Sequence, residues 1–321
     1  MRAPEFWQRR GLAAILLSPL GVFYGASVAR KARRALPYRA KAKVLCVGNL
    51  TAGGSGKTPV VLALGSALLA RGKKIVFLTR GYGGSERGPL HVKGAHTSAQ
   101  VGDEALLLAR VAPTIVARNR AQGAMLAEKL GADIIIMDDG HQNFTLAKDL
   151  SLVVVDGESG FGNGLMIPAG PLREPVAQGL ARADAVVVMN PPMRNQEAAA
   201  KRNFELSDFT GPILRARLAP QSAELAGRKL FAFAGIGRPE KFLASLNEAG
   251  VHITGSRFFA DHHPYSEAEL TALRRRGDLV TTAKDLVRLT ARQRQGIAVL
   301  EVAANFDDDP APLLDRLGTG V

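Results

Sequence analysis

The stretch VLCVGNLTAGGSGKTP at residues 44–59 joins an apolar run to a glycine-rich turn and a Gly-Lys-Thr triplet. The apolar run predicts a buried strand, and the apolar residues that recur after position 59 predict a helix. Glycines let backbone N–H groups surround an anion without a Cβ in the way. Strand, turn and helix together predict a phosphate-binding loop, hereafter the P-loop, rather than a glycine-rich turn with a stray lysine.

The P-loop residues carry the functional groups that a bound nucleotide requires. Lys57 is long enough to reach the β- and γ-phosphates of ATP, and the Thr58 hydroxyl is a ligand for Mg²⁺. The helix that follows adds the positive end of its dipole. The usual G-x-x-x-x-G-K-[ST] pattern is altered at its first position, which is Thr51 here. We expect the nucleotide to contact Thr51, Ala52, Gly53, Gly54, Ser55, Gly56, Lys57 and Thr58.

Size and composition are those of a globular protein. A chain of 321 residues is long enough for two domains. Its single cysteine, Cys46, falls inside the apolar strand, where we expect a reduced core residue. A nucleotide-binding loop without a disulfide framework predicts a cytoplasmic location.

The formal net charge of +13 indicates an anionic partner. We expect no nucleic acid, because the sequence contains no recognition motif for it and few aromatic residues on which bases could stack. Anionic membrane lipid, or an anionic lipid substrate, is the partner that the distribution of charge favours.

That distribution is clearest near the N-terminus. Residues 11–29 carry no charge, and arginines and lysines flank them on both sides. Trp7 and Tyr24 lie near the edges of the run, where aromatic rings prefer a membrane interface. Because the run is short for a span and contains Pro19, we expect a helical hairpin or bent helix lying on an anionic membrane surface. A signal peptide and a buried core helix are the alternatives.

Beyond the P-loop, β-branched apolar runs alternate with helical patterns. Such runs predict an α/β fold of the P-loop NTPase type, a mostly parallel sheet with helices on both faces. The strands are expected at 74–79, 114–117, 133–137, 152–155 and 185–188.

A second, smaller α/β domain is expected towards the C-terminus. Its strands are predicted at 230–234, 251–258, 279–282 and 297–302, and a linker is expected near 214–219. We divide the chain into an N-terminal membrane-associated helical segment (1–40), a P-loop domain (41–215) and the second α/β domain (216–321).

Two pairs of acids are candidates for metal binding or proton transfer. Asp138 and Asp139 end a predicted strand, which is where carboxylates near a P-loop hold Mg²⁺; a solvated turn is the alternative. Asp103 and Glu104 open a predicted helix. There, a helix cap and a general base with a metal-linked neighbour are equally compatible with the sequence.

A histidine cluster, a loop and a set of basic residues are three further candidates for the site. The Asp261-His262-His263 cluster fits a histidine oriented for proton transfer, a capping turn before Ser266, or a zinc site that lacks further ligands. The loop at residues 162–175, GNGLMIPAGPLREP, is rich in glycine and proline, as site-lining loops often are. Phosphate charge could be neutralised by Arg80, Arg173 and Lys284.

Taken together, these motifs resemble the lipid A 4'-kinase family, the tetraacyldisaccharide 4'-kinases. The matching stretches occur in order over most of the chain: GNLTAGGSGKTP (48–59), LTRGYGG (78–84), VGDEALLL (101–108), IIIMDDG (134–140), IPAGPLREP (167–175), FAGIGRPEKF (233–242), FADHHPY (259–265) and TTAKDLVR (281–288). The resemblance implies ATP-dependent phosphorylation of the 4'-hydroxyl of a tetraacylated disaccharide 1-phosphate. It also implies a peripheral protein on the cytoplasmic face of the bacterial inner membrane.

The resemblance also implies roles for individual residues. Asp103 would be the base, paired with a histidine of the Asp-His-His cluster, for which His262 is the better candidate. Glu104, Asp138 and Asp139 would be the metal-linked acids. The P-loop itself predicts Thr58 as a further ligand of Mg²⁺ and Lys57 as the residue that acts on the transferred phosphate.

The chain departs from the family pattern in two places. The family's Phe-Gln-His after Asp-Asp-Gly is His141-Gln142-Asn143 here, and its Thr-Thr-Glu-Lys-Asp has Ala283 in place of the glutamate. The first puts any role of the third position in doubt, and the second removes a carboxylate near Lys284.

Other classes of protein fit less well. A membrane-associated P-loop ATPase switch is the main alternative, but those switches carry a signature lysine where this chain has Ala52. A GTPase would need an Asn-Lys-x-Asp guanine reader, which the sequence lacks. A non-enzymatic lipid-binding module would not need Lys57 and Thr58.

Overall fold

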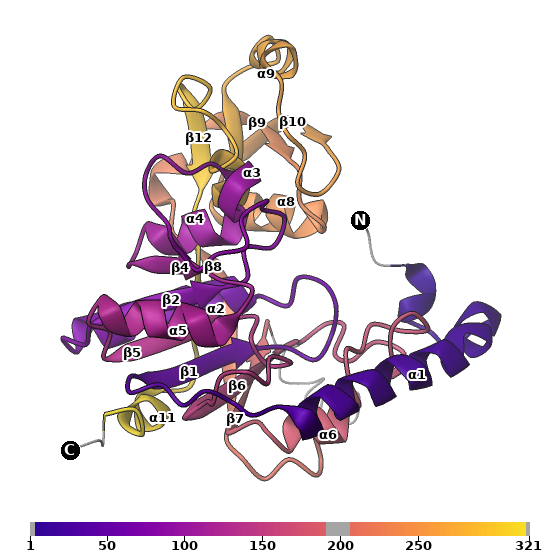
Figure 1. Cartoon of the computed structure of the whole chain (residues 1–321). Coiled ribbons are helices and arrows are strands. Elements are labelled where there is room, and N and C mark those ends of the chain that lie inside the picture. The colour runs from indigo at the N-terminus through magenta and orange to yellow at the C-terminus, as the bar shows by residue number, and fades with distance from the viewer. Residues whose placement is uncertain (1–3, 191–205, 319–321) are drawn as a thin grey trace.

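The apolar run before the P-loop forms a central strand of a nine-stranded sheet (Figure 1). The protein is described by a computed structural model that covers residues 4–190 and 206–318. Strand order is β13-β8-β7-β6-β1-β5-β2-β4-β3, parallel throughout except for β13 and β3 at the two edges. The strands are β1 (Lys43–Gly48), β2 (Ile75–Thr79), β3 (Leu90–His91), β4 (Thr114–Val116), β5 (Ile134–Asp138), β6 (Leu150–Asp156), β7 (Ala185–Met189), β8 (Ile213–Pro220) and β13 (Val302–Phe306).

Both faces of the large sheet are buried, as the continuous apolar runs predicted. Side chains alternate along a strand, so Leu45 and Val47 enter one apolar cluster, whereas Val44 and Cys46 enter the other. Cys46 is a free, buried core residue, as expected. The helices of this part are α2 (Lys57–Ala70), α3 (Ser98–Val101), α4 (Asp103–Ala109), α5 (Arg120–Lys129), α6 (Val176–Leu180) and α11 (Ala311–Asp315).

The second domain contains a four-stranded parallel sheet of order β10-β9-β11-β12. It lies above the large sheet in Figure 1, with loops of the two parts facing each other beside α4. Its elements are η3 (Ala223–Leu225), β9 (Lys229–Ala234), α8 (Pro239–Glu248), β10 (His252–Phe258), α9 (Glu267–Arg274), β11 (Leu279–Thr282), α10 (Ala283–Leu286) and β12 (Ile297–Leu300).

Two expectations about the second half of the chain are wrong. The segment near 214–219 is not a linker but most of strand β8 of the large sheet. The single strand expected at 297–302 contains the whole of one strand and the first residue of another: β12 belongs to the small sheet, and β13 returns to the large one. The division at residues 40 and 215 stays a prediction.

The uncharged N-terminal run forms one continuous helix, α1 (Leu12–Arg34), rather than a hairpin, after a short turn of 3-10 helix, η1 (Glu5–Trp7). Pro19 lies inside α1. By length and composition α1 could cross a membrane, and only 17% of its most apolar stretch is buried. Leu12, Leu16 and Phe23 are 81, 78 and 74% exposed, which is not the pattern of a core helix.

Glycines set how α1 lies against the rest of the protein. A Cβ on Gly21 would lie 2.8 Å from the carbonyl oxygen of Met166, and Gly25 faces the Met166 side chain. The helix therefore packs on the 162–175 loop through its smallest residues and leaves its larger apolar side chains exposed.

His141, the first departure from the family pattern, is a core residue. Its Nε2 donates to the carbonyl of Gly179 at 2.9 Å, so that Nδ1 accepts from the Ser151 hydroxyl at 3.2 Å. A Cβ on Gly48 would lie 2.5 Å from that of His141, which shows how closely the ring is packed. Burial lowers the pKa of His141 to about 3, so the ring is neutral in the folded protein.

This buried histidine predicts a loss of stability in mild acid. The unfolded chain binds a proton below a pKa of about 6.5, whereas the folded protein does not do so until about 3. The free energy of unfolding should therefore fall as pH decreases below about 6.5, by about 2 kcal/mol at pH 5 from this residue alone. Urea unfolding at pH 7.5 and pH 5 should show a smaller fall for His141→Phe than for the wild type. Ser151→Ala, which removes a hydrogen bond but no titrating group, should keep the wild-type slope; equal slopes in all three proteins would contradict the prediction.

Candidate active site

The P-loop leaves β1 and enters α2 through two glycines with positive φ. Gly53 has φ 118° and Gly56, at the start of α2, has φ 85°, which L side chains rarely adopt. A Cβ on Gly53 or Gly54 would meet nothing within 4 Å, so this side of the loop is open. Its base is fixed from inside, because Asn49 Nδ2 donates to the buried Ser55 hydroxyl at 3.0 Å. The result is an open backbone cradle above a helix N-terminus, which suits a phosphate group.

Asp138 lies beside the P-loop because its strand pairs with β1. Residue 138 is in register with Val47, and the Thr58 hydroxyl donates to Asp138 Oδ2 at 3.2 Å. Burial, together with the charge of Asp139, raises the pKa of Asp138 to about 7. Its Oδ1 is buried without a hydrogen-bond partner. A buried, unpartnered carboxylate oxygen next to a threonine hydroxyl fits the oxygen ligands that Mg²⁺ prefers.

Asp139 faces the basic residues of the site. Its Oδ1 accepts from Arg173 at 2.8 Å and lies 3.6 Å from Lys57 Nζ. Although burial opposes ionisation, Lys57 and Arg173 outweigh it and lower the pKa of Asp139 to about 2. Asp139 is one of three non-glycine residues with positive φ in the described part of the chain, the others being Asn190 and His262. Such strain is often found at functional sites.

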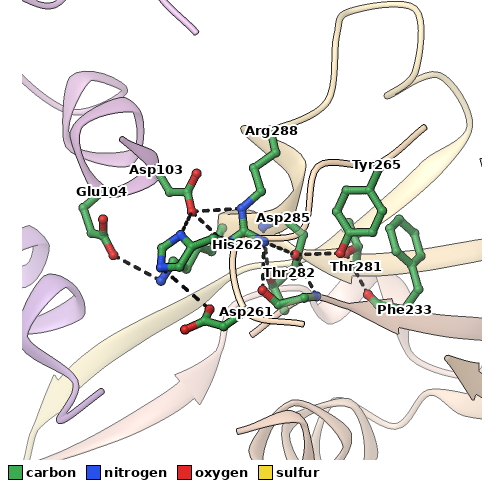
Figure 2. A network of polar contacts seen from close by, with 12 residues as sticks. Asp103, Glu104, Phe233, Asp261, His262, Tyr265, Thr281, Thr282, Asp285 and Arg288 are labelled. Atoms are coloured by element: carbon green, nitrogen blue, oxygen red, sulfur yellow. Dashed lines mark hydrogen bonds and ion pairs between the residues drawn. The ribbon is translucent and has the colours of Figure 1, made fainter. Parts of the chain in front are cut away.

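Asp103 and His262 come together from the two domains, as Figure 2 shows. Asp103 is in the first turn of α4, and His262 Nδ1 donates to its Oδ2 at 2.7 Å. Arg288 donates to the same oxygen from Nε at 2.9 Å and from a terminal nitrogen at 2.7 Å. Burial would raise the pKa of Asp103, but the bonds from His262 and Arg288 outweigh it, so the pKa lies below its ordinary value. The carboxylate is thus held ionised and oriented.

The second histidine of the cluster has a different role. His263 Nε2 lies 3.0 Å from Glu269 Oε1, and Glu269 forms a capping box with Ser266 at the start of α9. The capping interpretation is therefore correct for His263, whereas His262 fits the proton-transfer interpretation. In the described ranges, no group of three or more His, Cys, Asp or Glu residues could hold a metal, so the zinc interpretation has no support.

Glu104 points towards the second domain as well. Its Oε1 lies 3.1 Å from Lys284 Nζ, and its Oε2 is buried without a hydrogen-bond partner. Lys284 therefore pairs with a candidate metal-linked acid, and Arg173 pairs with another. Arg80, the third residue expected to neutralise phosphate, is exposed just after β2.

The 162–175 loop connects the P-loop to α1. The Ala52 N–H donates to the carbonyl of Pro171 at 2.8 Å, and the Arg173 N–H donates to that of Leu50 at 2.7 Å. At its other side, the Trp7 indole donates to the carbonyl of Pro168 at 3.0 Å. A cavity of about 330 Å³, mostly apolar, lies between this loop and α1 and is lined in part by Val22, Leu165, Met166 and Val176.

Two residues with contacts between the domains were not predicted from the sequence. One is Arg288, which belongs to the TTAKDLVR stretch but had no expected role. The other is Asp156 at the end of β6, which accepts from Arg238 at 3.0 Å and from Lys241 at 2.8 Å, both of the second domain. The only available signal was the position of Asp156 at the carboxyl end of a sheet strand.

Comparison with known proteins gives one consistent result. The profile of the family described as tetraacyldisaccharide-1-P 4'-kinase matches residues 13–319. The tetraacyldisaccharide 4'-kinase of Paramagnetospirillum magneticum is 52% identical over 328 residues, which cover 99% of each chain. That of Rhodospirillum rubrum is 50% identical and covers 100% of this chain and 99% of its own. A crystal structure of LpxK from Aquifex aeolicus in complex with ATP superimposes with a TM-score of 0.77 at 26% identity, over 96% of this chain and 99% of that one.

Proposed function

The chain belongs to the tetraacyldisaccharide 4'-kinase family, and we propose that it transfers the γ-phosphate of ATP to the 4'-hydroxyl of a tetraacyldisaccharide 1-phosphate, a step of lipid A biosynthesis. One observation of the structure carries the assignment of the site: His262 of the second domain orients the Asp103 carboxylate, and α4, which begins at Asp103, contacts α2, which begins at Lys57 of the P-loop. A P-loop ATPase switch would have no use for a carboxylate–histidine pair supplied from two domains. The direct test is to incubate the protein with ATP, Mg²⁺ and the lipid, and to ask whether the lipid gains phosphate.

On this proposal, ATP binds along residues 51–58. The open cradle of the P-loop and the N-terminus of α2 would surround the phosphates, and Lys57 would neutralise charge that builds on them. The unpartnered oxygens of Asp138 and Glu104, with Thr58, would hold Mg²⁺ directly or through water, with Asp139 beside them. The metal would supply charge neutralisation for the phosphates.

Asp103 is the proposed base for the acceptor hydroxyl. Phosphoryl transfer passes through a loose transition state, so the position of the base contributes more than its basicity. All the hydrogen bonds that Asp103 accepts from other side chains in the described ranges go to Oδ2, which leaves Oδ1 to receive the proton. His262 holds the carboxylate in place from the second domain.

Helix α1 is the proposed membrane element, on the cytoplasmic face of the inner membrane. Its exposed Leu12, Leu16 and Phe23 offer apolar surface, and Lys31, Arg33 and Arg34 lie in its last turn. Basic residues near an anionic bilayer contribute roughly 1 kcal/mol each. Pulling an acyl chain into water costs about 0.8 kcal/mol per CH₂, so the active site must come to the headgroups. The cavity between α1 and the 162–175 loop is a suitable place for part of an acyl chain.

Lys57→Ala should abolish phosphate transfer to the lipid, because no other P-loop residue supplies a positive side chain. Transfer from radiolabelled ATP, followed by chromatography of the lipid, measures the effect. Lys74→Ala, at an exposed lysine, is the matched control and should retain activity. Near-normal turnover of Lys57→Ala would contradict the P-loop assignment.

Asp103→Ala should lower turnover by a factor on the order of 10²–10⁴, the range for loss of a general base, with little change in ATP affinity. His262→Ala should lower it less. Because the two residues act as a pair, the double variant should be less impaired than the product of the single effects. Steady-state kinetics of the three variants measure this, and fully multiplicative losses would argue against a working pair.

Adding charge to α1 should release the protein from membranes. The variant Leu16→Glu/Phe23→Glu removes two exposed apolar side chains, each worth roughly 1.5–3 kcal/mol when fully buried. It is preferable to deletion of residues 1–30, which would also remove the contact between Trp7 and the 162–175 loop. Sedimentation with anionic vesicles should fall and the apparent KM for lipid in mixed micelles should rise, while ATP binding stays intact.

The matched control for this charge variant is Met125→Glu on α5, where the side chain is 42% exposed and far from α1 in sequence. It should sediment like the wild type. If the α1 variant sedimented equally well and kept its KM, α1 would not be the membrane element.

A further inference from the structure

Arg288 lies at the centre of a buried polar network between the two domains (Figure 2). Its side chain is 4% exposed and that of Asp103 is 5% exposed. Removing one partner of such a buried pair leaves a charge without compensation, so the pair acts as a unit. The unit is made of one residue from each domain, separated by 185 positions in the sequence.

Hydrogen bonds within the second domain fix the guanidinium group of Arg288 in the orientation from which it contacts Asp103. One of its terminal nitrogens donates to Asp285 Oδ1 at 2.7 Å and to the carbonyl of Gly235 at 2.8 Å. Asp285 is fully buried and is fixed in turn by the Tyr265 hydroxyl at 2.8 Å and the Gly235 N–H at 2.9 Å. The remaining N–H groups of Arg288, on Nε and the other terminal nitrogen, are the ones that reach Asp103.

His262 and Arg288 are held by the same backbone carbonyl group. The backbone N–H of His262 donates to the carbonyl of Gly235, the acceptor that Arg288 also uses. Both side chains then meet at one oxygen of Asp103. The three donated bonds fix that oxygen and leave Oδ1 free of side-chain donors in the described ranges.

We propose that Arg288 is a positioning residue for the base: it holds Asp103 Oδ2 from the second domain, so that Oδ1 is aimed at the acceptor hydroxyl while the two domains are docked. This inference rests on the proposed function, in which Asp103 is the base. Arg288 itself stays on the side of the carboxylate that faces the second domain.

Arg288→Gln should lower kcat for lipid phosphorylation by on the order of 10²-fold, because small misplacements of a catalytic group cost about that much. The dissociation constant for ATP should stay within about twofold, since the P-loop is untouched. Arg288→Lys keeps the charge with fewer bonds and should recover part of kcat. In the Asp103→Asn background, Arg288→Gln should have almost no further effect on kcat, because residues that act as one unit are not additive. A multiplicative effect in that background, or normal kcat in both Arg288 variants, would overturn the proposal.

Arg238→Gln is the matched control for docking of the domains. Arg238 joins the same two domains through Asp156 at 3.0 Å and does not contact Asp103. If Arg288 acts through position, Arg238→Gln should have a much smaller effect on kcat. A loss as large as that of Arg288→Gln would show that docking in general, and not the position of Asp103, was affected, and would overturn the proposal.

A spectroscopic readout separates this inference from the proposed function. In protein labelled with ¹⁵N-histidine, the signal of the His262 Nδ1–H, assigned through His262→Gln, reports its bond to Asp103. It should shift in Arg288→Gln and stay in place in Arg238→Gln, whether or not the lipid is phosphorylated. An unmoved signal in Arg288→Gln would overturn the positioning role. An inactive wild type with the expected shift would contradict the proposed function alone. Thermal unfolding of each variant checks that it is folded. If Arg288→Gln does not fold, the same measurements on Arg288→Lys test the proposal.

Discussion

Three N–H groups from the second domain converge on one carboxylate oxygen at the start of α4, and the position of Asp103 depends on that contact. Asp103 and Arg288 are both almost fully removed from water. Desolvating two charges is costly unless each is fully hydrogen-bonded. Here Asp285, Gly235 and Tyr265 complete the bonding on the second-domain side. The contact is therefore favourable only when all the partners are in place. Asp103 has this orientation only while the two domains are docked.

The same distribution of charge recurs at two further contacts between the domains. Acids of the P-loop domain meet bases of the second domain: Glu104 meets Lys284, and Asp156 meets Arg238 and Lys241. A nucleotide would bring further negative charge to the P-loop side of this junction. On the proposed function, Mg²⁺ bound to Glu104 would weaken the ion pair between Glu104 and Lys284. On the proposed function, the junction that holds the domains together is thus also sensitive to what the P-loop binds.

Much of this architecture could be predicted because parallel strands buried on both faces are apolar without interruption. Strands β1, β5 and β7 follow that rule. Strand β8 does not, because it lies next to the edge strand and alternates exposed residues such as Ile213 and Arg215 with buried ones. Its polar positions made it look like a linker. Strands β12 and β13 are separated only by Glu301, and no local pattern indicates that the chain changes sheets there.

The residues of the site also divide into those that the sequence predicted and those that it did not. The P-loop and the Asp138–Asp139 pair were predictable, because each is a short motif whose chemistry is local in sequence. His141 was recognised as a departure, but its burial between Ser151 and Gly179 comes from packing across three segments. Arg288 could not be assigned, since an arginine three positions after an aspartate looks like an ordinary helix-surface pair. Its role depends on a partner 185 residues away.

The glycines of α1 show how a feature that weakens a helix can position it. Gly21 and Gly25 are unfavourable within a helix by roughly 1 kcal/mol each relative to alanine. They allow α1 to approach Met166 more closely than any larger residue would permit. Through the 162–175 loop, that approach connects α1 to the backbone of the P-loop at Ala52. If α1 lies in the membrane surface, as proposed, the nucleotide is held at a fixed height above the headgroups. The 162–175 loop is then the connection between the membrane element and the P-loop.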